Sequence, residues 1–291
     1  MDQRIGILSA ASILGADRFV IWDCYSCEES TYNRKLHFHD FFELSLIYEG
    51  ESDFLVNGDS VTVTPGTVHL VTPSDYHMQC TKPSQSFRYY NFIFTADVIS
   101  EEIANALEDH NGPICLKPSP REKQEIFELA QTLLSEYQSL ANDPPPPFCE
   151  QLIEHGIEAL CILILRAMPE SAEREDDRLL PIRRALSIIR RQYRQKLTLQ
   201  EVAEQVYLSP TYFSQLFHKT MGVPFSEYLT DYRLQIAARY LRAGNLPLKE
   251  IASLVGFPTF PYFSAAFKKR FGVAPSAYRK AIETEQGKTL A

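Results

Sequence analysis

The sequence of 291 residues has no apolar run that is long enough to span a lipid bilayer. The longest apolar helical segment, near Ile157 to Met168, is too short and too interrupted for that purpose. The N-terminus also lacks the basic start and unbroken apolar core of a signal peptide, because Asp17 and Arg18 interrupt its small apolar run. We therefore expect a soluble, cytoplasmic protein with no membrane partner.

Cysteine pairs at the spacing of a zinc site are also scarce. Six cysteines are scattered along the chain, and Cys24 and Cys27 form a C-x-x-C pair without a second pair at zinc spacing. We interpret the cysteines as reduced, unpaired thiols of a cytosolic protein. A zinc or redox role for the C-x-x-C pair is the alternative.

Acidic residues are few in the C-terminal third of the chain, although the whole chain has a net charge of −8. Residues 179–282 contain sixteen Lys and Arg against five Asp and Glu, which is a charge of +11. Residues 1–178 contain twelve against thirty, which is −18, and the last nine residues add −1. The length suffices for two domains, and a basic module attached to an acidic one indicates binding to a phosphate backbone.

The basic region contains one short element twice. Residues 212–223 reappear as residues 262–273, with Tyr, Phe, Ser, Phe, Lys, Gly and Val in register. A shorter helical segment precedes each copy, at residues 199–206 and 248–255. The repeated unit is therefore a helix, a tight turn and a second helix.

The residues of the repeat favour this local structure. The first helix has one apolar face at helical spacing, formed by Leu199, Val202, Ala203 and Val206. Ser209 and Pro210 are typical of the start of the second helix, and Gly222 is typical of its end. Gly256 suits a turn with positive φ, whereas the first copy has Tyr207 at this place.

The second helix of each unit leaves polar and cationic side chains exposed, as reading of the major groove requires. In the first copy the predicted DNA-contacting residues are Thr211, Tyr212, Ser214, Gln215, His218 and Lys219. In the second copy they are Thr259, Phe260, Tyr262, Ser264, Lys268, Lys269 and Arg270. Gln215 is the candidate for a bidentate contact to adenine, and Arg270 for a contact to guanine or phosphate.

Residues 180–280 resemble the AraC/XylS-type transcription regulators. The resemblance rests on Tyr232-Arg233-Leu234-x-x-Ala237-x-x-x-Leu241, Ile251-Ala252-x-x-Val255-Gly256-Phe257 and Phe271-Gly272-Val273-x-Pro275-x-x-Tyr278-Arg279. It implies a DNA-binding domain in which a long helix, here residues 226–241, joins two helix-turn-helix units. Pro258 and Pro261 depart from the family pattern, which indicates that the second recognition helix mainly contacts phosphate.

The region from Leu36 to Thr95 consists of short apolar runs broken by turn residues, which is typical of a β-barrel or sandwich. Asn57-Gly58-Asp59 is a hairpin signal between two of these runs. From about residue 119 the apolar period changes from two to nearly four. Residues 122–141 and 148–168 are therefore predicted to form two helices.

Two histidine-rich segments resemble the cupin motifs. The first motif is matched by His37-x-His39-x-x-x-Glu43 and Gly50, without the upstream Gly. The second is matched by Gly66 and Thr72-x-Ser74-x-x-His77, with Thr72 in place of Pro and Ser74 in place of Gly. In metal-binding cupins the equivalent three histidines and glutamate hold the ion, whereas sensory domains of the AraC type often keep this signature without a metal.

The resemblance implies a ligand pocket inside the barrel. Its predicted residues are His37, His39, Glu43 and His77 at the mouth, with Tyr48, Trp22 and Tyr90 to stack on a ligand. His37 and His39 alternate along one strand and therefore face the same side, which suits binding of one ion. We expect no metal and no other cofactor, and a metal site formed by the four mouth residues is the alternative.

The predicted fold class is α+β with two domains. Residues 1–168 form a cupin-like β-barrel with a helical hairpin at 119–168, which resembles the dimerisation hairpin of the family or only covers the barrel. Residues 169–178 are polar and charged, as in an interdomain linker. Residues 179–282 form an all-α domain with two helix-turn-helix units, and residues 283–291 form a tail.

We predict a sequence-specific DNA-binding transcription regulator whose barrel senses a small molecule, such as a sugar or a related metabolite. The expected partners are double-stranded DNA, the effector, RNA polymerase and a second copy of the chain in a homodimer. We do not expect an enzyme. The alternatives are a metal-dependent cupin enzyme, such as a dioxygenase or isomerase, fused to a DNA-binding domain, and a constitutive DNA-binding protein whose barrel only dimerises.

Overall fold

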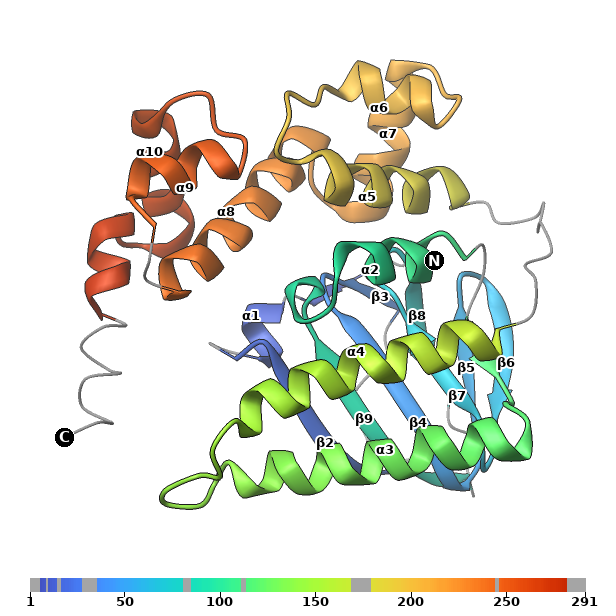
Figure 1. The fold of residues 1–291 in the computed structure, drawn as a ribbon. Coiled ribbons are helices and arrows are strands. Elements are labelled where there is room, and N and C mark those ends of the chain that lie inside the picture. The colour runs from blue at the N-terminus through green and yellow to red at the C-terminus, as the bar shows by residue number, and fades with distance from the viewer. Residues whose placement is uncertain are drawn as a thin grey trace. The chain divides into compact units, whose positions relative to one another are not determined.

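The computed structural model describes residues 6–8, 10–14, 17–27, 36–80, 85–110, 114–168, 179–243 and 246–281. The chain forms two compact units that divide between Leu179 and Leu180, and each unit is described by itself (Figure 1). The predicted linker at residues 169–178 and the predicted tail at residues 283–291 lie outside the described residues.

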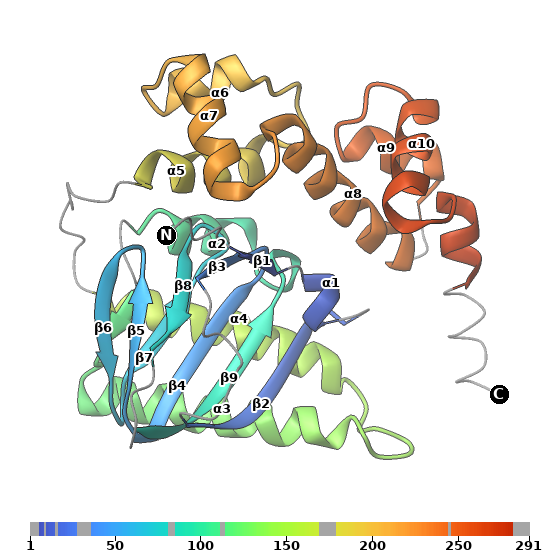
Figure 2. The same cartoon turned by 180° about the vertical axis from the view of Figure 1, so that it is seen from behind.

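The N-terminal unit contains two five-stranded sheets (Figure 2). The first sheet has the order β1 (Gly6–Leu8), β3 (His37–His39), β8 (Tyr76–Gln79), β5 (Ser52–Val56) and β6 (Asp59–Val63). The second has the order β10 (Ile114–Leu116), β7 (Val68–Val71), β4 (Phe42–Gly50), β9 (Ser86–Phe94) and β2 (Phe19–Cys27). Paired strands are antiparallel, except that β1 and β3 are parallel. This arrangement confirms the β-rich fold predicted for the N-terminal domain.

Alternation of side chains gives each strand of the second sheet two different faces. On β4, Phe42 and Leu44 belong to the apolar core that the sheet shares with the helices, and Glu43 and Ser45 lie on the opposite face. The turn between β5 and β6 follows the sequence signal, because Asn57 has a positive φ of 55° and the glycine after it has a φ of 91°.

Two long helices cover one face of the second sheet (Figure 1). Helix α3 spans Pro120–Ser139 and helix α4 spans Cys149–Ala167, which confirms two helices close to the predicted bounds. They approach closely at Gly156, where a Cβ atom would lie 2.3 Å from Cδ2 of Leu133. The shorter helices of this unit are α1 (Ala10–Ile13), η1 (Ala96–Val98) and α2 (Glu101–Glu108).

The described residues of the C-terminal unit form helices joined by short connections, as predicted. The helices are α5 (Leu180–Gln192), α6 (Leu199–Gln205), α7 (Pro210–Met221), α8 (Phe225–Ala243), α9 (Leu248–Leu254) and α10 (Phe260–Phe271), and residues 275–281 are also helical. Helices α6 and α7 form one helix-turn-helix unit and α9 and α10 form the other, with α8 between them (Figure 1).

The turns of the two helix-turn-helix units are built from similar residues and differ in length. Tyr207 and Gly256 occupy equivalent places after the first helix and have positive φ values of 59° and 82°. Ser209 and Thr259 cap the second helices, because each side-chain oxygen accepts a hydrogen bond from a backbone N–H three residues later. The second turn is one residue longer and includes Pro258, so this proline precedes the helix instead of distorting it.

Arg183 on α5 is buried, with a residue exposure of 7%. It lies one turn before the buried Leu186, at the edge of the apolar face, where its aliphatic stem can be covered. Within the described part of the chain, no helix is both long enough and apolar enough to cross a membrane.

Candidate functional site

Four of the predicted pocket residues lie side by side in the N-terminal unit. His37 and His39 come from β3, Glu43 from β4 and His77 from β8, where His77 pairs in register with His37. The ring centroids of His37 and His77 are 4.3 Å apart, and those of His39 and His77 are 5.0 Å apart. All four residues are buried.

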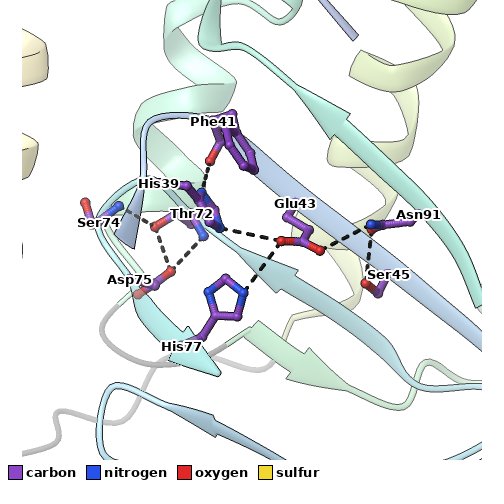
Figure 3. A network of polar contacts seen from close by, with 9 residues as sticks. All are labelled: His39, Phe41, Glu43, Ser45, Thr72, Ser74, Asp75, His77 and Asn91. Atoms are coloured by element: carbon purple, nitrogen blue, oxygen red, sulfur yellow. Dashed lines mark hydrogen bonds and ion pairs between the residues drawn. The ribbon is translucent and has the colours of Figure 1, made fainter. Parts of the chain in front are cut away.

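Glu43 contacts two of these histidines, His39 and His77 (Figure 3). Its Oε2 atom is 3.7 Å from Nε2 of His39 and 3.6 Å from Nε2 of His77. Its Oε1 atom accepts a hydrogen bond of 3.2 Å from Nδ2 of Asn91, and Oγ of Ser45 donates to Oδ1 of Asn91 over 3.2 Å. The carboxyl group is therefore held from both sides by residues of three strands.

Burial controls the charges in this group. It raises the pKa of the Glu43 carboxyl to about 7, although the hydrogen bond from Asn91 acts in the opposite direction. Burial lowers the pKa of His77 well below its ordinary value, and the neighbouring His39, His37 and His69 lower it further. At neutral pH the contact between Glu43 and His77 therefore joins an uncharged imidazole to a carboxyl group that is close to its titration point.

Short-range contacts orient the histidines. Nδ1 of His39 lies 2.7 Å from the carbonyl oxygen of Phe41, whose ring stacks on the imidazole at a centroid distance of 4.1 Å. Before His77, Oδ2 of Asp75 accepts hydrogen bonds from the backbone N–H and the hydroxyl of Thr72, at 2.8 and 2.7 Å (Figure 3). The backbone N–H of Ser74 donates to the Thr72 hydroxyl. The residues that replace the usual Pro and Gly of the cupin motif thus stabilise the turn that leads to His77.

A narrow cavity lies between the two sheets beside this group. Its lining residues are Glu43, Ser45, Phe54, His69, Val71, His77, Gln79 and Tyr89. The gaps between the atoms here add up to about 240 Å³, part of it open solvent, and as the side chains stand they leave no room for a molecule of the size of water. His69 is not among the pocket residues predicted from the sequence, although alternation along β7 places His69 and Val71 on one face and the core residue Leu70 on the other.

The three predicted stacking residues have different positions. Trp22 pairs with Asn91 across β2 and β9, so it lies on the same face as Asn91, and it is 38% exposed at the edge of the sheet. Tyr90 lies on the opposite face, where its hydroxyl accepts a hydrogen bond from Gln131 of α3. Tyr48 contacts Tyr90 at a ring-centroid distance of 4.8 Å and donates to Asp23. Tyr48 and Tyr90 therefore do not line the cavity, because their strand positions direct them towards the helices.

Three of the four residues discussed as metal ligands form a compact donor set. One ligand atom each from His39, Glu43 and His77 lies within 4.8 Å of the others. Two imidazoles and a carboxylate are a known donor set for iron(II) and related divalent ions. His37 adjoins this set through its contact with His77.

Helix α7 presents all six of its predicted DNA-contacting residues to solvent. Phe213 and Phe217 anchor the helix through its buried face, and Gly222 ends it with a φ of 72°. The exposed residues are Thr211, Tyr212, Ser214, Gln215, His218 and Lys219. They form a polar surface on the face away from the core of the unit.

Helix α10 presents a smaller polar surface than predicted. Lys268 and Lys269 are exposed, and Tyr262 is 54% exposed. Phe260 is half-buried, and its ring lies 6.1 Å from that of the buried Phe263. The side chain of Phe260 therefore contributes to packing at the start of the helix.

Three further predicted DNA-contacting residues of the second copy are less available to DNA. Two of them have partners within the C-terminal unit, and the third is half-buried. Arg270 Nε donates to Oδ1 of Asp231 on α8, and the Arg270 guanidinium lies 5.4 Å from the ring centroid of Phe271. Thr259 Oγ1 accepts a hydrogen bond from the backbone of α10, and Ser264 is half-buried. Arg270 is thus held against the joining helix, a contact that sequence reasoning missed because its partner lies 39 residues away.

Comparisons with known proteins agree with this arrangement. Residues 23–145 match the family model of the AraC-like ligand binding domain, and residues 184–281 match a model of a helix-turn-helix domain. The uncharacterized HTH-type transcriptional regulator YfiF of Bacillus subtilis is 25% identical over 255 residues, which cover 85% of this chain and 79% of YfiF. The melibiose operon regulatory protein of Escherichia coli is 23% identical over 252 residues, which cover 84% of this chain and 83% of that protein.

A solved structure is similar to the C-terminal unit. It is the C-terminal domain of AraT, a response regulator from Geobacillus stearothermophilus, with 42% identity and a TM-score of 0.35. The match covers 36% of this chain and 88% of that domain. With both family models matched in order and full-length relatives that are HTH-type regulators, the chain belongs to the AraC family of transcription regulators.

Proposed function

We propose that this regulator binds a small-molecule effector in the cavity between its two sheets and that the effector controls DNA binding. The observation that carries the proposal is the cavity itself, with its buried polar residues, in the same chain as two helix-turn-helix units. Buried polar side chains at the centre of the N-terminal unit support a sensing role for this unit, and the response of DNA binding to small molecules separates this proposal from a constitutive DNA-binding protein. The regulator acts in this proposal without enzymatic turnover.

On DNA, the exposed face of α7 reads bases and α10 mainly holds the backbone. Gln215 on α7 is exposed and has the side chain that pairs with adenine in two hydrogen bonds. Lys268 and Lys269 on α10 are exposed cations suited to phosphate. Two such units on one module address major-groove faces about one helical turn, ~34 Å, apart.

The effector is a sugar or a related small metabolite in this proposal. One relative is named for the melibiose operon, which supports a sugar without identifying one. The effector changes how the N-terminal domain contacts its own helices, a second copy of the chain or the DNA-binding domain. Recruitment or blocking of RNA polymerase in the cytoplasm then follows from the changed occupancy of DNA.

A homodimer formed through α3 and α4 is part of the proposal. Leu152 and Ile162 on α4 are large apolar side chains with exposures of 49% and 39%. They lie on the side of the helix that is turned away from its buried face, which includes Ile153 and Ile157. Pairing of two copies through this surface would bury them.

The test is DNA binding by the purified full-length protein with and without small metabolites. A target is first selected from random double-stranded DNA by repeated rounds of binding. A compound that changes the affinity for the selected DNA at least tenfold is the expected result. Binding that no compound changes would instead support the constitutive DNA-binding protein.

A second candidate is a metal-dependent enzyme fused to the DNA-binding unit, and the compact set of His39, Glu43 and His77 favours it. A bound divalent ion would supply Lewis-acid or oxygen chemistry at these ligands. The measurement is the metal content of protein purified without added ions, compared with the Glu43→Gln variant. Stoichiometric metal that the variant loses would favour this candidate over the sensor.

A further inference from the structure

The second helices of the two helix-turn-helix units, α7 and α10, turn the same face towards solvent. Phe213 on α7 and Phe263 on α10 stand at matching places and are both 0% exposed. The residues just before them, Tyr212 and Tyr262, are both 54% exposed. Each residue of α10 is therefore oriented, relative to the core of its own helix-turn-helix unit, like the residue at the matching place in α7.

At two of these matching places, α10 lacks the hydrogen-bonding groups that α7 has. Thr211 and Gln215 on α7 correspond to Pro261 and Ala265 on α10, and all four residues are exposed. A threonine hydroxyl and a glutamine amide can form hydrogen bonds with base edges, whereas the side chains of proline and alanine cannot. Because the N-terminal part of a recognition helix contacts the bases, α10 presents an apolar surface where α7 presents a polar one.

The polar side chains of α10 and its cap have other positions or partners. Thr259 Oγ1 caps the helix, and Nε of Arg270 donates to Oδ1 of Asp231 on α8. The exposed Lys268 and Lys269 lie in the last turn of α10, on the side of the helix end and away from its N-terminal part. The surface formed by Pro261 and Ala265 therefore keeps its apolar character.

An apolar surface in the major groove can recognise one chemical group. Thymine alone presents a methyl group there, on its C5 atom, whereas the other base edges present hydrogen-bond donors and acceptors. Contact between an alanine Cβ and this methyl removes both from water and adds dispersion attraction. A guanine or cytosine edge at the same place would lose its water without gaining a hydrogen bond, which costs free energy.

We propose that Ala265, together with Pro261, reads the methyl group of a thymine in the half-site of α10. The two residues are four positions apart on one helix, so they are neighbours on its surface. This inference rests on the proposed function, in which α10 holds the DNA backbone through its lysines, and it adds a base contact to that role. The protein thus reads one half-site through hydrogen bonds of α7 and the other through a methyl contact of α10.

The experiment uses the full-length protein and a duplex selected from random DNA. Each thymine is replaced in turn by uracil, which keeps the base pairing and removes only the methyl group. The dissociation constant is measured by fluorescence anisotropy of labelled DNA at one salt concentration. Uracil at one thymine is expected to weaken binding roughly three- to fivefold, which is the loss expected for one buried methyl group. At the same place, 5-methylcytosine is expected to bind better than cytosine by a similar factor.

Two variants of Ala265 connect this effect to the residue. Ala265→Gly removes the Cβ atom and is expected to bind the thymine and uracil duplexes equally. Ala277→Gly is the matched control, because Ala277 is an exposed helical alanine outside both recognition helices, and it should keep the full difference. Ala265→Gln supplies the amide that Gln215 has on α7 and is expected to change the preferred base from thymine to adenine. If Ala265→Gly does not fold, Ala265→Gln decides.

Two results would overturn the inference. One is the absence of any thymine at which uracil weakens binding. The other is an equal loss on uracil in the wild type and in Ala265→Gly, which would assign the effect to the shape of the DNA. In both cases a protein that still selects a DNA sequence contradicts only this inference and leaves α10 as a backbone contact. A protein that selects no sequence from random DNA would instead contradict the proposed function.

Discussion

The backbone carbonyl oxygen of Tyr193 lies where a side chain of Gly256 would begin. A Cβ atom on Gly256 would be 2.4 Å from this oxygen, which is closer than any real contact allows. Tyr193 follows α5, next to the first helix-turn-helix unit, whereas Gly256 is in the turn of the second. Arg233 of α8 holds the same segment, because it donates to the carbonyl oxygens of Tyr193 and Gln195 over 2.8 and 2.7 Å.

This contact connects the two helix-turn-helix units directly, in addition to the connection through the joining helix α8. Arg233, which belongs to the motif of the joining helix, binds backbone carbonyl oxygens and so fixes the end of α5. A fixed end of α5 between α8 and the second turn limits relative motion of α7 and α10. Such rigidity is what a module needs to address two major-groove faces at a constant separation.

Replacement of Gly256 by alanine should destabilise the C-terminal unit by about 2–4 kcal/mol. The added methyl group collides with the Tyr193 carbonyl, and the φ of 82° is unfavourable for alanine. Denaturant unfolding followed by far-ultraviolet circular dichroism measures the loss. The control is Gly222→Ala, which has a similar φ of 72° but no atom within 4 Å of the new Cβ, so it should cost only about 1–2 kcal/mol. Equal losses in both variants would contradict the steric part of the explanation.

Tyr207→Gly should stabilise the C-terminal unit by about 1 kcal/mol, through the turn of the first helix-turn-helix unit. Tyr207 has a φ of 59°, a conformation that a glycine adopts without steric cost. The side chain is 86% exposed, so its removal loses little packing. The same unfolding assay checks the sign. A destabilised variant would indicate that the tyrosine side chain makes a stabilising contact that outweighs its backbone strain.

Gln215→Ala and Lys269→Ala should affect DNA binding in different ways. Loss of the Gln215 amide should cost about 1–3 kcal/mol at one base position and relax the preference there. Loss of the Lys269 charge should weaken binding evenly on all sequences and reduce the salt slope by about 1. Competition between selected and altered DNA at several salt concentrations separates the two effects. An even loss for Gln215→Ala, or an unchanged slope for Lys269→Ala, would refute the corresponding role.

Glu43→Gln should change the pH dependence of stability in a defined direction. The carboxyl has a pKa of about 7 in the folded protein against an ordinary 4.5, because burial favours its neutral form. Between these pH values the folded protein binds more protons than the unfolded chain, so the contribution of Glu43 to stability is lost as the pH rises from 4.5 to 7. Relative to the wild type, the variant should therefore gain about 2–3 kcal/mol across this window.

Trp22 fluorescence is a suitable readout of this effect, because Trp22 is the single tryptophan and lies in the N-terminal unit. His69→Phe provides a comparison, because the stability that His69 contributes should change with pH in the opposite direction. The pKa of His69 falls from 6.5 to about 4 on folding, so its contribution is present above pH 6.5 and lost as the pH falls towards 4. This variant should gain stability relative to the wild type on acidification. A pH-independent difference in both variants would contradict the burial of these groups.

The sequence alone determined the parts of the protein that depend on local chemistry. Caps such as Ser209 and end residues such as Gly222 specify helix bounds within a few residues, because they satisfy backbone groups close to them in the chain. The repeated aromatic residues Phe213 and Phe263 identified two equivalent units, because the same apolar spacing buries the same face. Asn57 specified its hairpin in the same local manner.

Only the tertiary structure decided which distant residues meet. The contacts of Arg270 with Asp231 and of Tyr193 with Gly256 depend on how helices pack, and no local pattern records that packing. The same holds for His69, which becomes a cavity residue because β7 of one sheet faces β5 and β8 of the other. Side-chain type and strand alternation set the face on which a residue lies, whereas the pairing and stacking of the sheets decide what lies opposite to it.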